Sequence, residues 1–371
     1  MFKSAGILGC AALALLLAGC ASTPDSGEAL PPDWSTNGVA AKPVLPPRTQ
    51  PIPLAVKTNL PAVILHTNPP SAVVARPQPI LTWTSLDRWA AENKVGPVRR
   101  LSGGPTTRYF IDAKNGLLVL EIGSREAIWH GMQFHLGFAP EIIDNQVFVH
   151  GLDVQKNLVP LMLGVPPEFG TNRVIVIDPG HGGANGGTIS VVDKRPEKEF
   201  TLDWARRIKP LLELEGWQVF LTRTNDVDIA LSNRVAVAES HHADLFISLH
   251  FNSLAPDQRP TGLATFCLTP SGMPSTITRD YPDFASQYFP NNGYDLRNLQ
   301  VAAQLHRALL HATGVEDRGV NRARFMGVLR GQRRPAVLIE AGFLSNPAEA
   351  RKIENPDFRQ KLAEGVANAL K

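Results

Sequence analysis

The sequence predicts an α/β protein, with an open mixed sheet covered by helices on both faces in its carboxyl-terminal half. Two observations predict this sheet. Apolar runs such as Val174–Ile177 are typical of strands buried on both faces. Segments with the period of a helix, such as 199–215, alternate with these runs. A third observation, a change of composition near residue 80, predicts a small α+β domain and a Pro-rich tether ahead of this half.

The amino-terminal residues 1–19 are expected to form a lipoprotein signal peptide. Lys3 gives a positive start, and the apolar run at 5–18 is too short to span a bilayer comfortably. Leu17-Ala-Gly-Cys20 resembles the lipobox of bacterial lipoproteins, which implies cleavage before Cys20 and lipidation of Cys20. Because Ala21 follows the cysteine, the same resemblance implies export and a lipid anchor at the periplasmic face of the outer membrane. A plain secretory signal is the alternative.

Residues 20–79 are expected to form a tether that begins at the lipidated cysteine. The segment is dense in proline and lacks long apolar periods, and such chains favour an extended form of about 3.1 Å per residue. Of the three cysteines, Cys10 leaves with the signal and Cys20 is acylated. Only Cys267 stays a thiol, so no intramolecular disulfide is expected in the mature chain.

Residues 80–165 are expected to form the small α+β domain. A short helix is predicted at Thr84–Asn93, with Leu86, Trp89 and Ala90 facing inward, and Asn115-Gly116 predicts a hairpin. A further strand near 147–151 and a helix at 154–163 complete it. This domain faintly resembles the amino-terminal modules found beside wall hydrolases, so a wall-binding or positioning role is expected. The remaining notable side chains lack the spacing of metal ligands and are expected to be structural or on the surface: His130, His135 and His150.

The region 172–371 is expected to hold the mixed sheet. The predicted strands are at 173–178, 217–222, 244–250, 261–268 and 335–340, with a further one around 325–329. The predicted helices are at 199–215, 231–240, 298–313 and 356–370. Gly262 and Gly319 are expected to mark turns.

Three predicted strands deliver a side chain suited to acid–base or metal chemistry at their carboxyl ends. These side chains are His181, His250 and Glu340. Because open α/β sheets build their sites at this edge, we expect the three to lie close together. A further carboxylate, from Glu197 or Glu199, lies at the start of the following helix.

Two histidines and a carboxylate, with a second carboxylate to spare, suit a catalytic Zn²⁺ site with three protein ligands and a water molecule. Zinc lowers the pKa of its water from about 15.7 to about 7. A nearby Glu can move a proton from that water to a leaving amine, and acid–base work of this kind typically contributes about 10²–10⁴ in rate. The pattern therefore predicts amide hydrolysis without a nucleophilic Ser or Cys.

Five blocks of this region occur in a distinctive order: Asp178–Gly183, Glu197-Lys198, Leu221–Asp226, Ser248–Ser253 and Ile339–Asn346. This order resembles the zinc-dependent N-acetylmuramoyl-L-alanine amidases of the type 3 amidase family. The resemblance covers 172–371, about half of the chain. It implies hydrolysis of the amide that joins N-acetylmuramic acid to L-alanine in peptidoglycan.

The resemblance also implies roles for individual residues. His181, Glu197 and His250 stand at the positions of the family's zinc ligands, and the Glu-Lys match favours Glu197 over its neighbour Glu199. Glu340 stands at the position of the catalytic Glu, which acts first as a base and then as an acid. We expect Asp178 to orient the loop of His181.

Two places depart from the family's pattern. After His181-Gly-Gly the family often carries an Asp, whereas this chain has Ala184-Asn-Gly-Gly187, a difference that concerns the local turn. The segment 268–295 is rich in Pro, Gly and Asn, and it is either a lid over the cleft or a plain surface excursion.

Two other functions are left open. One is a zinc peptidase that cuts stem peptides, and the other is a non-catalytic wall-binding lipoprotein. The net charge of +3 is mild and nothing resembles a nucleic-acid module, so the expected partners are peptidoglycan and, through Cys20, a membrane. An activator protein is a further open partner. Six arginines between 318 and 334 face an anionic wall polymer, form a solvated surface or fix a loop.

Overall fold

The computed structural model describes residues 82–101, 104, 106–165, 167, 169, 173–278 and 283–371. The predicted signal peptide, the predicted lipidation site Cys20 and the predicted tether up to residue 79 lie outside these residues. In the part of the chain that is described, no helix combines the length and the apolar character that crossing a bilayer requires.

The carboxyl-terminal half is built around a mixed sheet, as predicted. Its strands follow the order β10-β9-β11-β14-β12-β13, in which β9, β10, β11 and β14 are parallel and β12 runs antiparallel to β14. The strands are β9 (Val174–Pro179), β10 (Gln218–Leu221), β11 (Leu245–Asn252), β12 (Leu263–Cys267), β13 (Asp317–Arg322) and β14 (Ala336–Phe343). Every residue of β11 and β14 is buried, because helices cover both faces of the sheet.

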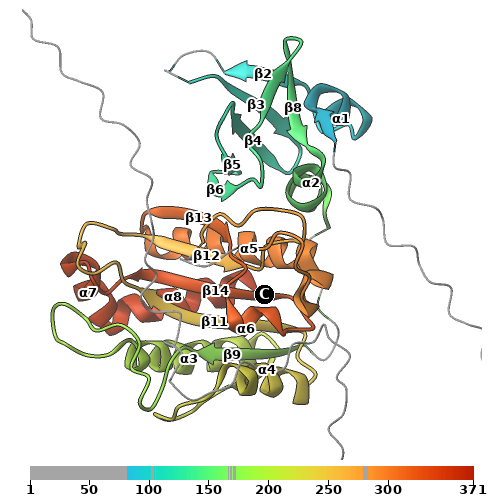
Figure 1. Cartoon of the computed structure of the whole chain (residues 1–371). Helices are drawn as coiled ribbons and strands as arrows, with labels where there is room; N and C mark the ends of the chain where they lie inside the picture. The colour runs from blue at the N-terminus through green and yellow to red at the C-terminus, as the bar shows by residue number, and fades with distance from the viewer. Residues whose placement is uncertain are drawn as a thin grey trace, which may run out of the picture. The chain divides into compact units, whose positions relative to one another are not determined.

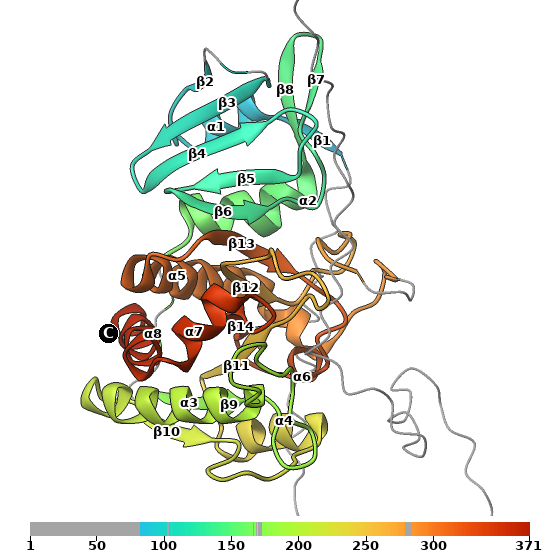
Figure 2. The same cartoon turned by 90° about the vertical axis from the view of Figure 1, so that its left-hand side faces the viewer.

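Alternate residues of the central strands pack in two separate hydrophobic cores. Ile175, Ile247 and Ile339 pack in one core with residues of α3, α5 and α8, whereas Val176, Phe246 and Leu338 pack in the other with residues of α4 and α6. Figure 1 shows the strands of this sheet lying one beside the next, and Figure 2 shows α3, α5 and α8 on one side of them and α4 and α6 on the other. The helices are α3 (Glu197–Leu214), α4 (Leu231–Ser240), α5 (Asp295–Thr313), α6 (Gly327–Arg330), α7 (Pro347–Glu354) and α8 (Pro356–Ala369), and a 3₁₀ turn, η2 (Pro290–Tyr294), precedes α5.

Residues 82–165 form an α+β module. Antiparallel strands run in the order β6-β5-β4-β3-β2, and a second small sheet has the order β1-β8-β7 (Figure 2). The predicted helix is present as α1, with Leu86, Trp89 and Ala90 buried, and the predicted hairpin joins β3 to β4. The elements are β1 (Trp83–Ser85), α1 (Leu86–Glu92), β2 (Val98–Leu101), β3 (Arg108–Ala113), β4 (Gly116–Glu121), β5 (Glu126–Trp129), β6 (Met132–His135), β7 (Glu141–Ile143), β8 (Gln146–His150), α2 (Gly151–Asp153) and the π-helix η1 (Val154–Leu163).

The module continues the sheet of the carboxyl-terminal half. Strand β6 pairs in parallel with β13 through Phe134 and Val320, so a single sheet of eleven strands runs from β10 to β2. Polar contacts add to this seam. The backbone N–H of Gln133 donates to the Asp317 carboxylate at 2.7 Å, and Arg125 donates to the carbonyl oxygens of Pro274 and Ser275.

Several expectations about individual elements are wrong. The segment expected as a strand around 325–329 contains helix α6 instead. Strand β13 is not among the predicted strands, because its residues Asp317–Arg322 are mostly polar, and Gly319 lies within this strand at φ +77° rather than in a turn between elements. The prediction also lacks helix α7 and the short strands β1, β2, β5, β6 and β7, which have only three or four residues each. Because β1 includes Thr84, the first helix begins at Leu86 and not at the predicted Thr84.

Candidate metal centre

His181 lies in the turn directly after β9, and the backbone of this turn packs closely against His250. A Cβ atom on Gly180 would lie 2.3 Å from the ring of His250, so only glycine allows the two segments to approach this closely. His181 itself has φ +61°, a conformation that L-residues rarely adopt and that is common at functional sites. The sequence Pro-Gly-His-Gly-Gly therefore ends the strand and turns the imidazole toward the neighbouring strand.

Glu197 is the first residue of α3 and is fully buried. Its Oε1 atom accepts hydrogen bonds from the His250 ring at 2.9 Å and from the backbone N–H of Phe251 at 3.0 Å. Its Oε2 atom accepts the N–H of Thr188 and lies 3.1 Å from His181 Nε2. Glu199, the alternative ligand, is exposed and pairs with Arg195. The geometry thus brings Glu197, and not Glu199, to the two histidines.

One ligand atom from each of His181, Glu197 and His250 lies within 4.8 Å of the others, and all three residues are buried. The two imidazole rings are 4.8 Å apart between centroids and nearly perpendicular, at 83°. The three residues are far apart in the sequence. Strand β11 lies beside β9, which brings His250 next to the His181 turn.

Glu340 lies on β14, directly opposite His250 of the neighbouring strand β11. Its side chain is buried, at 1% exposure, and its charge acts on His181. The fourth predicted site residue therefore lies at the same sheet edge as the other three.

Asp178 does not contact the His181 ring. Its carboxylate accepts hydrogen bonds from Thr222 and Arg234 at 2.6 Å each and from Ser248 at 2.8 Å. Arg234 in turn donates to the carbonyl oxygen of His181 at 2.9 Å. Asp178 therefore holds the backbone of the turn through Arg234, a residue that sequence reasoning missed.

A second buried arginine, Arg223, also binds the backbone of this turn. Arg223 donates to the carbonyl oxygens of Pro179 and Gly180, at 3.0 and 2.8 Å, and to that of Lys198 in α3. Arg223 belongs to the Leu221–Asp226 block, which is the signal in the sequence that marks it. Arg223 links the end of β9 to the start of α3, so it fixes His181 and Glu197 relative to each other.

The charges of the cluster depend on one another. Burial alone would raise the pKa of Glu197, but His181 and His250 outweigh it and hold the pKa of this carboxyl below its usual range. Burial would lower the pKa of His181, yet Glu197 raises it overall, whereas burial dominates at His250 and lowers its pKa. Glu197 is thus a carboxylate at neutral pH, as metal binding requires.

The three residues could hold a metal ion. Two imidazoles and a carboxylate are a donor set found in catalytic zinc sites. His181 Nε2 is buried and close to Glu197 Oε2, but it is not aligned to form a hydrogen bond. A buried ring nitrogen in this position is well placed to bind a cation instead.

The segment 268–295 leaves the sheet at the strand ends that lie opposite the candidate metal centre. Because β12 is antiparallel to β14, the chain after Cys267 departs beside the start of β14, away from Glu340. Asn291 donates to the carbonyl oxygen of Arg334, just before β14. The described part of this segment is therefore placed as a surface excursion and gives no support to the lid alternative.

One arginine of the group between 318 and 334 fixes this excursion. Arg324 is buried, pairs with Asp283 and donates to the carbonyl oxygens of Pro270 and Met273. Arg334 is also buried, but it donates to the carbonyl oxygens of Ala238 and Ala243 instead. The loop-fixing alternative is thus confirmed for Arg324. Cys267 is buried against Arg322, as its apolar surroundings in the sequence predict.

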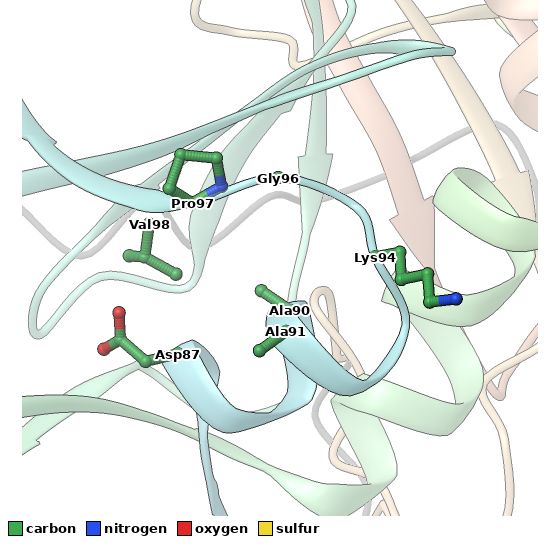
Figure 3. A pocket seen from close by; sticks show the side chains of 7 residues that line it. All are labelled: Asp87, Ala90, Ala91, Lys94, Gly96, Pro97 and Val98. Carbon is green, nitrogen blue, oxygen red and sulfur yellow. The ribbon is translucent and has the colours of Figure 1, made fainter.

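The module holds a hollow of about 470 Å³ between α1 and β2. Figure 3 shows Asp87, Ala90, Ala91 and Val98 around it. No residue of the candidate metal centre lines this hollow.

Comparison with known proteins is consistent with the site. A family model described as N-acetylmuramoyl-L-alanine amidase matches residues 175–371, which is more than half of the chain. Two relatives, both named N-acetylmuramoyl-L-alanine amidase AmiC, come from Escherichia coli O6:H1 and Neisseria meningitidis serogroup B and are each 33% identical to this chain, over 243 and 270 residues.

The alignments cover 59% and 60% of this chain and 58% and 63% of the two relatives, so the chain spans about three fifths of the length of the curated relatives it matches. A solved structure of an N-acetylmuramoyl-L-alanine amidase from Clostridium difficile 630 is 30% identical, with a TM-score of 0.45. It covers 54% of this chain and 96% of that chain.

Proposed function

Because this chain belongs to the N-acetylmuramoyl-L-alanine amidase family, we propose that it hydrolyses the amide bond between N-acetylmuramic acid and L-alanine in peptidoglycan. The observation that carries the proposal is the convergence of His181, Glu197 and His250, with Glu340 opposite His250 on the next strand. Three ligand-type side chains and a separate carboxylate are what metal-assisted amide hydrolysis requires.

We infer that His181, Glu197 and His250 hold Zn²⁺. Zinc in such a site polarises a carbonyl oxygen and lowers the pKa of a water molecule from about 15.7 to about 7. The Glu340 carboxylate accepts the proton of the attacking water and returns it to the nitrogen of L-alanine. Burial beside the ligand cluster keeps bulk water from competing for that proton.

Digestion of purified sacculi tests this function. The expected products are stem peptides with a free L-alanine amino group and glycan chains with free lactyl carboxyl groups, both identified by mass spectrometry. Cleavage within the stem peptide instead would indicate the zinc peptidase. Intact sacculi would leave the non-catalytic wall-binding alternative.

A matched pair of variants separates catalysis from binding. Glu340→Gln should bind zinc but digest the sacculi far more slowly, whereas Glu199→Gln, a change of an exposed Glu in the first turn of α3, should digest them as fast as the wild type. A Glu340→Gln protein that digests at the wild-type rate would refute the role given to Glu340.

We also propose that the mature protein is lipid-anchored through Cys20 at the periplasmic face of the outer membrane. The lipobox-like Leu17-Ala-Gly-Cys20 and the proline-dense segment after it support this proposal. Two or more acyl chains anchor a protein stably, because each buried CH₂ contributes about 0.8 kcal/mol. Incorporation of labelled palmitate into the wild type, and none into Cys20→Ser, is the expected result; equal labelling would refute it.

The module at 82–165 is proposed to bind or orient peptidoglycan. Its continuous sheet with the catalytic half supports a positioning role, because the pairing of β6 with β13 joins the module directly to that half. Sedimentation of the Glu340→Gln protein with sacculi measures binding without digestion, and unchanged sedimentation after substitutions on the module would contradict the proposal. An activator protein is left open as a further partner.

A further inference from the structure

The turn that follows His181 folds back on the imidazole ring. Gly182 and Asn185 exchange two backbone hydrogen bonds, of 2.8 and 3.1 Å, which close the turn. This closure places the side-chain Oδ1 of Asn185 at 2.8 Å from His181 Nδ1. The other ring nitrogen, Nε2, faces Glu197 Oε2 at 3.1 Å. The two nitrogens of one ring therefore have different neighbours.

This difference decides which nitrogen is able to bind a metal ion. A neutral imidazole carries a single N–H, so one nitrogen donates and the other offers its lone pair. The carboxamide oxygen of Asn185 is an acceptor, and it holds the proton on Nδ1. The lone pair is then on Nε2, which points toward Glu197 and the centre of the cluster.

The rest of the turn keeps the Asn185 side chain in place. The backbone N–H of Gly187 donates to the same Oδ1 atom at 3.3 Å. At Gly187, which has φ +71°, a Cβ atom would lie 2.6 Å from both Glu197 Oε2 and His181 Cδ2. The turn is thus packed directly against two members of the cluster, and neither the ring nor the carboxamide has space to rotate freely.

We propose that Asn185 is a positioning residue for the metal centre, which fixes the Nδ1–H tautomer of His181 so that Nε2 is the ligand atom. The inference rests on the proposed metal site and goes beyond it, since it assigns a residue outside the ligand set. Outer hydrogen-bond partners of this kind fix the tautomer and ring orientation of a ligand histidine. As a neutral amide, Asn185 does so without adding a negative charge beside Glu197.

Zinc affinity of the purified protein, measured by competition with a chromogenic chelator, is the first test. Asn185→Ala should weaken binding by about 10–100-fold, the usual effect of losing such a partner. Asn185→Asp keeps an acceptor oxygen and should bind within about threefold of the wild type. Asn225→Ala, which removes an exposed asparagine in the nearby loop after β10, should leave the affinity unchanged. Unchanged affinity in Asn185→Ala would overturn the proposal.

The tautomer itself is the second test, and it needs no variant. In the zinc-loaded wild type, long-range ¹H–¹⁵N spectra should place the remaining proton of His181 on Nδ1, with slow exchange with solvent. A proton on Nε2 would overturn the proposal even if Asn185→Ala fails to fold. Both tests are made without substrate, so a protein that passes them but leaves sacculi intact would refute the proposed function and not this inference.

Discussion

Two buried histidine–carboxylate clusters in this protein use the same groups in different ways. In the first, His306 of α5 bonds Thr265 through Nδ1 at 3.0 Å and Asp317 through Nε2 at 2.8 Å. Asp317 also accepts the backbone N–H groups of Gln133 and Gly319. In the second cluster, two histidines share Glu197, and His181 Nε2 has a close neighbour but no aligned hydrogen bond.

The contrast shows how a structural histidine differs from a candidate ligand. Both ring nitrogens of His306 are used by protein groups, so the ring joins β12 to β13 and has no capacity left for a metal ion. The second cluster instead brings together a carboxylate and two rings without supplying a hydrogen-bond partner to every ring nitrogen. Burial alone therefore does not separate the two roles, since all three histidines are buried; the hydrogen-bond partners do.

The largest expected effect is the loss of the Glu197 carboxylate, compared with the matched loss of the Asp317 carboxylate in the other cluster. Glu197→Gln should weaken zinc binding by more than the roughly 100-fold cost of losing an outer partner, because a direct ligand is lost, and sacculus digestion should fall to the level of chelated enzyme. Asp317→Asn, the matched change in the other cluster, should retain zinc and activity. Loss of zinc from both variants in chelator competition would erase the contrast.

Glu340→Gln is expected to have the next largest effect. Digestion should slow by about 10²–10⁴-fold, because the amide accepts no proton from water. Zinc affinity should stay at the wild-type value, which distinguishes this residue from Glu197. The rate is measured as release of soluble peptide from labelled sacculi, and a simultaneous loss of zinc would place Glu340 among the ligands instead.

His306→Ala tests the structural cluster. The change removes one hydrogen-bond partner each from the partly buried Asp317 and the buried Thr265 and creates a cavity, so the free energy of unfolding should fall by about 2–4 kcal/mol. Denaturant titration of the apo-protein measures this loss. Zinc affinity should not change, and a variant as stable as the wild type would show that the ring contributes no net stability.

Asp153 extends the comparison to a buried carboxyl with no histidine partner. Burial raises its pKa to about 6, although Gly137, Phe138 and Asn157 donate hydrogen bonds to it. The folded state thus holds this proton more tightly than the unfolded chain, so this group's contribution to stability should be highest at low pH and fall as the pH rises from about 4 to about 6. Asp153→Asn should be less stable overall but should show a smaller slope in this pH window. Equal slopes in pH-dependent unfolding would contradict this prediction.

The apolar strands in the sequence, and the side chains that follow their carboxyl ends, predicted the sheet and the clustering of His181, His250 and Glu340. It succeeded because a buried parallel strand has a strong apolar pattern, and because parallel strands bring their carboxyl ends to one edge. The same reasoning missed β13, because Asp317, Gly319 and Arg322 interrupt the apolar pattern that is typical of a buried strand. That strand is stabilised by its neighbours β12 and β6, a tertiary effect that local pattern does not contain.

Residues that act through the backbone were also beyond the sequence. Arg234 looks like an ordinary surface arginine until its carbonyl partner is known, and the block that contains Arg223 does not reveal which carbonyl oxygens Arg223 binds. Asn185 stands out in the sequence only as part of a departure from the family's pattern, because its role depends on a turn that closes by backbone hydrogen bonds. In contrast, the choice of Glu197 over Glu199 rested on a neighbouring lysine, and the structure gives it an independent reason in burial.

The pairing of β6 with β13 carries a consequence for any shortened form of the protein. Removing residues 82–165 would remove β6, which pairs with β13 through Phe134 and Val320, and would expose that edge of β13 to water. A catalytic half prepared on its own is thus exposed to edge-to-edge self-association. In the folded molecule the module covers an edge of the sheet that would otherwise be open to pairing with a second copy of the protein.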